Sequence, residues 1–144
     1  MRISNLIEDF IKQSLKQSGE TELQRNVLAV QLGCVPSQIN YVLATRFSPE
    51  RGYVVESRRG GGGYIKVTQV RPGDGNYVMH CLNVIGESIS QSDAKAFVVN
   101  FLDYGIITQK EAKLIISAIS SLPLPQPEQN TVRAVLLKNI LLNL

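Results

Sequence analysis

The chain has 144 residues, of which 44% are hydrophobic and 19% charged, and its formal net charge is +3. This length fits one ordinary domain or two small ones with a buried core. Glu8 and Asp9 interrupt the first apolar stretch, which excludes a signal peptide, and no uncharged run is long enough to span a bilayer. Cys34 and Cys81 match no metal or disulfide spacing and indicate free thiols in a reducing compartment. We therefore expect a cytoplasmic protein without a membrane partner.

The positive charge lies in the first half of the sequence. Residues 1–72 contain ten Lys or Arg and six Asp or Glu, whereas residues 73–144 contain five and six. A basic half joined to a nearly neutral, apolar half indicates one part that meets a polyanion and one that meets protein. The cations are densest within 46–71, at Arg46, Arg51, Arg58, Arg59, Lys66 and Arg71.

Three helices are predicted before residue 48. Apolar residues recur at helical spacing over 3–15, which predicts the first helix. Thr21 and Gln24 have the spacing of a capping box, so a second helix is expected to start near 21 and to stop at Gly33. Pro36 fits the first turn of a third helix, where its missing N–H costs nothing.

Residues 25–44 have the pattern of a helix-turn-helix. Ala29 is small where the two helices would touch, and Gly33 permits a tight turn between them. The alternative is an ordinary helical hairpin whose polar face is only solvated. The apolar residues expected to lock the second of these helices against the first are Leu28, Leu32, Val35, Ile39 and Val42.

Polar side chains remain on the outer face of the helix over 36–46. Such a helix fits the major groove of DNA, where Gln and Asn side chains can read adenine edges. The candidate DNA contacts on this recognition helix are Ser37, Gln38, Asn40, Tyr41, Thr45 and Arg46.

Two short alternating runs, 53–58 and 64–70, flank four consecutive glycines and predict a hairpin. A hairpin after a helix-turn-helix makes a winged helix, and a tip without Cβ atoms can lie on the floor of a minor groove. Its arginines then meet the groove walls. The alternatives are a tip with solvated arginines and a phosphate-cradling loop, which lacks the G-x-x-x-x-G-K-[S/T] pattern. The candidate wing contacts are Arg51, Arg58, Arg59, Gly60, Gly61, Gly62, Gly63, Tyr64 and Lys66.

The tyrosines of the hairpin leave two interpretations open. Tyr53 and Tyr64 either flank the wing tip and touch backbone phosphate or pack across the hairpin.

The run Pro-Gly-Asp-Gly-Asn at 72–76 is the clearest linker and places a domain boundary between residues 1–72 and 73–144. Four helices are predicted beyond it, one within 77–89, one over 93–104 with its cap near Ser90, and two more after Thr108. Thr108 opens the third of these with a capping box. That helix is expected to bury Ala112, Ile115, Ile116 and Ile119, and the last helix Val132, Val135, Leu136, Ile140 and Leu141.

Four short apolar helices make a thin core, so a second copy is expected to complete it as a homodimer. His80 is the only histidine, which excludes a metal site built on several histidines, and it is expected to be packed or to face a partner. No Ser/His/Asp grouping or carboxylate pair can be argued from these scattered residues. We expect a protein that is not an enzyme and has no cofactor and no metal.

The stretch "CVPSQINYV" followed by "TRF", "ERGY", "VES" and "RGGGGYI" within 34–65 resembles the CtsR family of class III stress gene repressors. A looser likeness continues through residues 89–114. The resemblance implies an α+β fold, with an N-terminal winged helix-turn-helix and two-stranded wing, followed by an all-α C-terminal dimerisation domain. It further implies a homodimer on a directly repeated operator, with the recognition helix in the major groove and the glycine-rich wing in the minor groove.

The same resemblance implies a repressor of heat-shock and protein quality-control (clp) genes that is released on heat or stress. It names a protein-arginine kinase and a Clp ATPase or protease as partners. Arg59, just before the glycines, is the candidate site of arginine phosphorylation, where a phosphate would replace attraction to DNA by repulsion.

The competing hypothesis is a protein-interaction adaptor in which the winged helix binds no nucleic acid, because winged helices also serve that way. Positive charge on both the recognition helix and the wing favours DNA, since an adaptor does not need it.

Overall fold

The computed structural model describes residues 2–58 and 63–144, and its chain divides into two compact units. The first unit contains residues 2–49 and 53–70, and the second contains 50–52 and 71–144. Within the described part of the chain, no single helix is both long and apolar enough to cross a membrane. The consecutive helices Arg25–Leu32 and Pro36–Arg46 reach that length and apolar composition only when they are taken together, and the chain bends by 102° between them.

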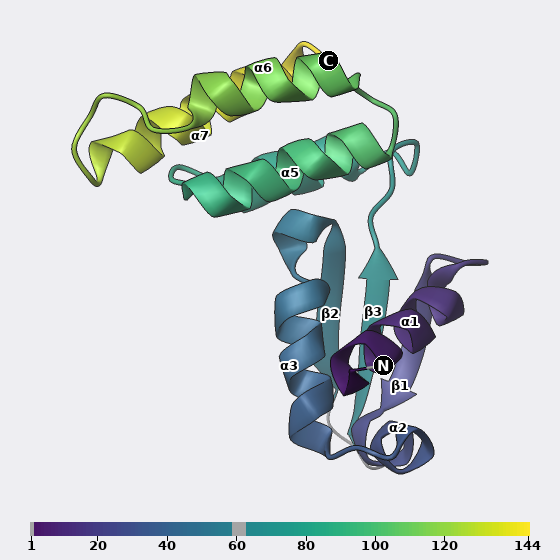
Figure 1. The fold of residues 1–144 in the computed structure, drawn as a ribbon. Helices are drawn as coiled ribbons and strands as arrows, with labels where there is room; N and C mark the ends of the chain where they lie inside the picture. Colours follow the sequence, from purple (N-terminus) through teal and green to yellow (C-terminus); the bar gives the residue numbers. More distant parts are fainter. Residues whose placement is uncertain (1, 59–62) are drawn as a thin grey trace. The chain divides into compact units, whose positions relative to one another are not determined.

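The first unit packs three helices against a small antiparallel sheet (Figure 1). Its elements are α1 (Ile3–Leu15), β1 (Glu20–Gln24), α2 (Arg25–Leu32), α3 (Pro36–Arg46), β2 (Tyr53–Arg58) and β3 (Tyr64–Gln69). A 3₁₀ turn, Pro49–Arg51, precedes β2 in the chain. The core of the unit consists of Ile7, Ile11, Leu15, Leu23, Leu28, Ala29, Ile39, Val42, Leu43, Phe47, Ile65 and Val67.

The sheet has three strands in the order β1-β3-β2. Its β2–β3 pair confirms the predicted hairpin, and β1 is an additional strand that corrects the predicted start of the second helix. Residues 20–24 form β1, and α2 begins only at Arg25. These residues form a strand rather than a helix because β1 pairs with the open edge of β3, and the pair Leu23–Ile65 joins the core. A ladder and apolar burial together outweigh a local capping pattern.

The predicted helix-turn-helix is present. Gly33 ends α2 with a φ of +71°, the left-handed conformation that favours glycine. Ala29 is buried, as are Ile39 and Val42 of α3. The expected burial of Val35 is wrong, because this residue precedes the first turn of α3 and its side chain is 54% exposed.

The second unit is all helical, with α4 (Tyr77–Ile85), α5 (Gln91–Asp103), α6 (Gln109–Ile119) and α7 (Glu128–Leu142). Two predicted caps are confirmed: Ser90 Oγ accepts from Asp93 N at 3.2 Å, and Thr108 Oγ1 accepts from Glu111 N at 3.1 Å. The apolar core of this unit contains Tyr77, Cys81, Ile85, Ile89, Ala94, Phe97, Val98, Phe101, Ile107, Ala112, Ile119, Ala134, Leu137 and Leu141.

The buried faces of α6 and α7 differ from the prediction. Helix α6 buries Ala112 and Ile119 but leaves Ile115 and Ile116 half-buried. Helix α7 buries Arg133, Ala134, Leu137 and Leu141. The expected stripe shares only Leu141 with this set, because Val132, Leu136 and Ile140 are half-buried and Val135 is 50% exposed. Helix α7 therefore has one buried face and a second, apolar face that its own unit covers only in part.

Arg133 takes the core position because its guanidinium finds acceptors there. Its Nε donates to the Ile119 carbonyl at 2.7 Å and its Nη1 to the Ile89 carbonyl at 3.2 Å. The side-chain oxygens of Asn130 and Gln129 accept two further bonds, at 2.5 and 2.6 Å. One buried cation thus joins α7 to the end of α6 and to the connection before α5. The contact with α6 is favourable because the last carbonyls of a helix carry a partial negative charge.

Candidate nucleic-acid interface

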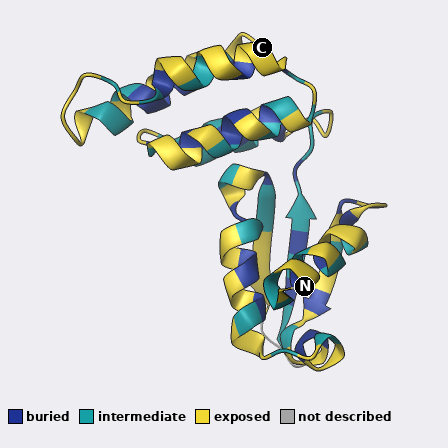
Figure 2. Cartoon of the chain, viewed as in Figure 1, coloured by how far each residue is buried: buried dark blue, intermediate teal, exposed yellow. Residues whose placement is uncertain are grey.

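The outward face of α3 carries most of the side chains that the sequence assigned to it. Figure 2 shows exposed residues along α3. Among the exposed residues of this helix are Ser37, Asn40, Tyr41 and Thr45. Tyr41 is 59% exposed, although a large aromatic side chain gains from burial. Gln38 and Arg46 are half-buried. The helix thus presents hydroxyl, amide and phenol groups on one exposed surface.

Two of these polar groups also serve the helix itself. The Gln38 Oε1 atom accepts a hydrogen bond from the Val35 backbone N–H at 3.0 Å, which satisfies a donor before the first turn. Thr45 Oγ1 donates to the Tyr41 carbonyl at 2.7 Å, four residues back. The amide nitrogen of Gln38 is the part of that side chain left for an outside acceptor.

Arg46 forms an ion pair with Glu8 of α1 at the end of α3. Its Nη1 atom donates to the Asn5 side-chain oxygen at 2.8 Å and to a carboxylate oxygen of Glu8. Partial burial alone would raise the pKa of Glu8, but hydrogen bonds from Lys12 and Arg46 outweigh it and lower that pKa. A phosphate contact by Arg46 stays a prediction, and it would have to compete with Glu8.

Arg25 is the site residue that the sequence did not reveal. Its Nε atom donates to Asn40 Oδ1 at 2.6 Å, and its Nη2 atom donates to Ser57 Oγ at 3.1 Å. The side chain therefore connects the first residue of α2 with the exposed face of α3 and with β2. In the sequence it is only an arginine at the start of the predicted helix-turn-helix. Its two hydrogen bonds could not be predicted, because both partners are distant in the chain.

The described ends of the wing are Arg58 and Gly63. Arg58 is exposed and pairs in register with Tyr64, which is half-buried. Gly63 has a φ of +67°, and a Cβ built there would meet nothing within 4 Å, so only backbone strain opposes a side chain. The remaining wing candidates, Arg59, Gly60, Gly61 and Gly62, lie outside the described residues.

Tyr53 lies at the other end of β2 and packs against the core. Its ring meets Phe47 edge-on with centroids 4.8 Å apart, which favours the packing interpretation for this tyrosine. Arg51 lies two residues before this end of β2 in the chain. At 3.4 Å per residue the length of β2 separates that end from Arg58 by about 17 Å. A contact of Arg51 with DNA remains a prediction, at a site distinct from the tip.

Lys66 lies among carboxylates on the outer face of the sheet. Its Nζ atom is 3.4 Å from Glu20 Oε2, and the residues opposite it in the ladder are Glu22 and Glu56. Directly opposed residues share a face of a sheet, so this cation is partly neutralised by its neighbours. The predicted contact of Lys66 with phosphate stays untested and is the least favoured electrostatically.

The first unit also has a cavity of about 300 Å³ between α3 and β2. Arg25 and Asn40 line it together with apolar residues and with Ser48, whose hydroxyl is buried and has no hydrogen-bond partner among the described residues. The Arg25–Asn40 hydrogen bond, which is itself exposed, thus lies at the wall of this cavity.

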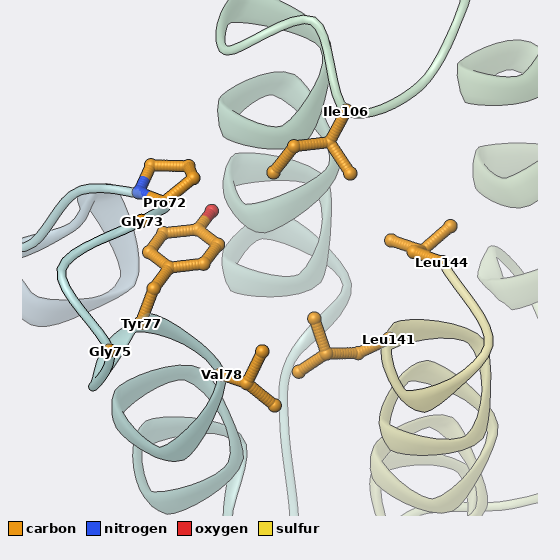
Figure 3. A pocket seen from close by; sticks show the side chains of 8 residues that line it. All are labelled: Pro72, Gly73, Gly75, Tyr77, Val78, Ile106, Leu141 and Leu144. Carbon is orange, nitrogen blue, oxygen red and sulfur yellow. The ribbon is translucent and has the colours of Figure 1, made fainter.

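The second unit has an apolar cavity of about 360 Å³. In Figure 3 the Tyr77 ring stands beside Pro72, and Val78 and Leu141 face each other across the lower part of the site. Burial and the nearby Cys81 raise the pKa of Tyr77, so its hydroxyl stays protonated. These groups offer no chemistry for binding a polyanion.

Other reactive groups in the described residues do not assemble into a site. Both cysteines are free thiols, as predicted, and burial raises the pKa of Cys81 to about 11. No group of three or more His, Cys, Asp or Glu that could hold a metal ion occurs within 2–58 and 63–144. The polar face of α3 with Arg25 and Arg58 is the arrangement that most resembles a binding surface.

Comparison with known families matches both halves of the chain. The model of the CtsR N-terminal HTH domain matches residues 2–71, and that of the CtsR C-terminal dimerization domain matches residues 74–142. The transcriptional regulator CtsR from Staphylococcus aureus strains USA300 and MRSA252 is 42% identical over 144 residues. That alignment covers 96% of this chain and 94% of the relative.

A solved structure is similar over nearly the whole length. The crystal structure of CtsR in complex with a 26-base-pair DNA duplex matches with a TM-score of 0.83 and 40% sequence identity, covering 99% of this chain and 97% of that one. The relatives are named as regulators of transcription rather than as enzymes. With both family models, the curated relatives and the solved fold in agreement, the chain belongs to the CtsR family of transcriptional regulators.

Proposed function

We propose that this protein is a DNA-binding transcriptional repressor whose α3 reads the major groove while the β2–β3 hairpin enters the minor groove. The observation that carries the proposal is the position of these two elements. Arg25 bonds to the exposed face of α3 and to the tip half of β2 at once, so the two elements lie close enough together to contact one duplex. The DNA duplex in the similar CtsR structure supports a nucleic acid as that ligand.

The contacts divide into two kinds. Ser37, Asn40 and Tyr41 are exposed on α3 and suit base edges or the adjacent backbone. Arg58 is exposed at the described end of β2 and suits the narrow groove, where A·T-rich DNA has an enhanced negative potential. The wing residues 59–62, outside the described part, complete the proposed minor-groove contact, with glycine giving steric access.

A second copy of the chain completes the proposed repressor. The matching family model is named a dimerization domain, and α7 carries an apolar stripe that its own unit leaves partly open. Two copies double the phosphate contacts and suit an operator with two half-sites, which we take to be directly repeated. The stripe proposed for this contact is Val132, Val135, Leu136 and Ile140.

The regulation proposed for the protein follows the family resemblance. Its targets are heat-shock and protein quality-control (clp) genes, and heat or stress releases it from DNA. Ordering a glycine-rich wing on DNA has an entropic cost that grows with temperature, so the wing contact is lost first on warming. Phosphorylation of Arg59 by a protein-arginine kinase would release it by charge, and a Clp protease would then remove the free protein.

Fluorescence anisotropy with A·T-rich duplexes tests DNA binding and its electrostatic part. If about four phosphates are neutralised per subunit, log K falls against log salt concentration with a slope of roughly −7 for a dimer. Arg58→Ala is expected to weaken binding, whereas Lys113→Ala, an exposed cation of the second unit, should leave it unchanged. A slope near zero, or equal effects of the two substitutions, would rule out the proposed interface.

Heat release has a separate test. Gly61→Ala reduces the number of conformations that the wing loses on binding, so it should keep affinity at low temperature and raise the temperature of release. Operator binding followed from low to heat-shock temperature measures this shift. Release of the variant at the wild-type temperature would reject the entropic account and leave DNA binding itself intact.

A further inference from the structure

Arg25 joins the two elements proposed to read DNA. Its Nε atom lies 2.6 Å from Asn40 Oδ1, and its Nη2 atom lies 3.1 Å from Ser57 Oγ. Asn40 is 15 residues away on α3, and Ser57 is 32 residues away on β2, next to Arg58. A single planar guanidinium therefore fixes the distance between the recognition helix and the tip half of the wing strand.

The hydrogen bond to Asn40 determines which way that amide points. A guanidinium has five N–H donors and no acceptor, so only the oxygen of the Asn40 amide can face it. The bond is also charge-assisted and short, which holds the amide more firmly than a neutral partner would. The amide nitrogen of Asn40 is consequently directed away from Arg25, on a residue that is exposed to solvent.

This orientation changes what Asn40 can recognise. An unrestrained asparagine pairs with adenine in two places, accepting from N6 and donating to N7. That pairing needs both ends of the amide at the base edge, and here the oxygen is turned toward Arg25, which takes one of its two lone pairs and restricts its approach to N6. The donor end is left unrestricted, and it suits an edge that offers acceptors, such as N7 and O6 of guanine or O4 of thymine.

We propose that Arg25 is a positioning residue that sets the base preference of Asn40, by holding its amide as a donor toward the major groove. The proposal rests on the function proposed above, in which α3 lies in that groove. The bond to Ser57 keeps the guanidinium in place, so the wing strand and the base-reading side chain share one anchor.

An arginine here also suits a phosphate directly, and the two roles predict different losses. Losing a phosphate contact lowers affinity by the same factor for every DNA sequence. Losing the restraint on Asn40 changes the preference at the single base pair that Asn40 reads. The base preference, measured apart from affinity, therefore separates the positioning role from a charge contact.

Selection from a randomised duplex library, followed by sequencing, measures base preference directly. Asn40→Ala is selected first, because the base pair at which its preference disappears is the one that Asn40 reads. At that pair the wild type should prefer guanine or thymine on the contacted strand. Arg25→Met should shift this preference about tenfold toward adenine and leave the ranking at other positions unchanged.

Three further variants complete the design. The double variant Arg25→Met with Asn40→Ala should show the preference of Asn40→Ala alone, since Arg25 acts through Asn40. Lys16→Met removes an exposed cation of the same unit and should not alter the preference at any position. Arg25→Gln replaces Arg25→Met if the latter does not fold, as circular dichroism would show, because glutamine does not impose the orientation of Asn40.

The outcomes separate this inference from the function on which it rests. A uniform loss of affinity in Arg25→Met, with the wild-type preference intact at the Asn40 base pair, overturns the positioning role and leaves DNA binding standing. A wild-type preference for adenine at that pair overturns it as well. A wild-type protein that enriches no sequence contradicts the proposed function itself.

Discussion

Arginine has opposite uses in the two units of this chain. In the first unit, Arg25 and Arg46 are half-buried and bond to polar side chains at the surface, where a ligand can still reach the unit. In the second unit, Arg133 is completely buried and bonds to two backbone carbonyls and two amide oxygens. The first unit keeps positive charge available for a partner, whereas the second uses it to hold helices together.

Burying Arg133 also determines what the second unit presents outward. Because this residue and Leu137 face the core, the stripe of α7 that contains Val135 is turned away from it. The first unit thus exposes polar groups on α3, and the second exposes apolar groups on α7. This contrast indicates two kinds of partner, a polyanion for one unit and a second copy of the chain for the other.

Replacing the buried guanidinium should have the largest effect. Arg133→Met leaves the carbonyls of Ile89 and Ile119 without this donor, and we expect a loss of about 3 kcal/mol in the free energy of unfolding. Arg133→Lys should lose less, because one ammonium reaches some of the acceptors. Urea unfolding followed by circular dichroism measures both, with the exposed Lys113→Met as the matched control. Equal stability of Arg133→Met and Lys113→Met would show that the buried cation is not needed.

The apolar stripe of α7 is tested by placing a charge on it. Val135→Glu should weaken the homodimer roughly 100-fold, because a carboxylate at the contact would be buried without a partner. Sedimentation equilibrium measures the dissociation constant, and Ser92→Glu, exposed on α5, is the control with the same charge change. A dimer of undiminished strength in Val135→Glu would place the contact elsewhere on the unit.

The wing should be sensitive in binding rather than in folding. Gly63→Val forces a β-branched residue into a φ of +67°, which costs about 1–2 kcal/mol of backbone strain although the space around it is open. Relief of that strain would displace the hairpin tip, so we expect about a tenfold loss of affinity for DNA. Gly63→Asn should bind nearly as well as the wild type, since asparagine tolerates this conformation. Equal binding by both variants would show that the hairpin tip does not contribute to DNA binding.

Local signals in the sequence predicted much of the fold. Pro36 marks the start of α3, and the caps at Ser90 and Thr108 mark the starts of α5 and α6 within their own first turns. Strand β1 was missed because its stability comes from a ladder with β3, at least 40 residues later in the chain. The buried face of α7 was missed for the same reason, since the acceptors that draw Arg133 inward include the remote carbonyl of Ile89.

The sequence could predict which residues lie in the candidate site, but not which of them bond to each other. Four of the six side chains assigned to the outer face of α3 are exposed there, because helical periodicity alone separates them from Ile39 and Val42. Neither the bond from Arg25 to Asn40 nor the pairing of Arg46 with Glu8 follows from spacing. Both depend on how distant elements pack, and they decide which polar groups are left for DNA.

The smallest expected effect concerns Arg46, a surface cation that is held by the carboxylate of Glu8. Glu8 binds Arg46 and Lys12, and its lowered pKa means that this pairing stabilises the fold above the pKa of an unfolded glutamate. The contribution is lost as the pH falls through the folded pKa. Glu8→Gln should therefore be less stable than the wild type by about 0.5–1 kcal/mol at pH 7, and the difference should shrink at an acid pH below the ordinary glutamate pKa.

Urea unfolding at both pH values, with the exposed Glu87→Gln as control, measures that difference. Titration of the Glu8 carboxyl by NMR gives its pKa directly, and Arg46→Ala should raise it, because one of the two cationic partners is gone. An unchanged pKa in Arg46→Ala would mean that Arg46 is not held by Glu8 in solution and is available to phosphate from the start. That result would make the contrast between the two units sharper, since Arg46 would then be free for a ligand while Arg133 stays buried in the core.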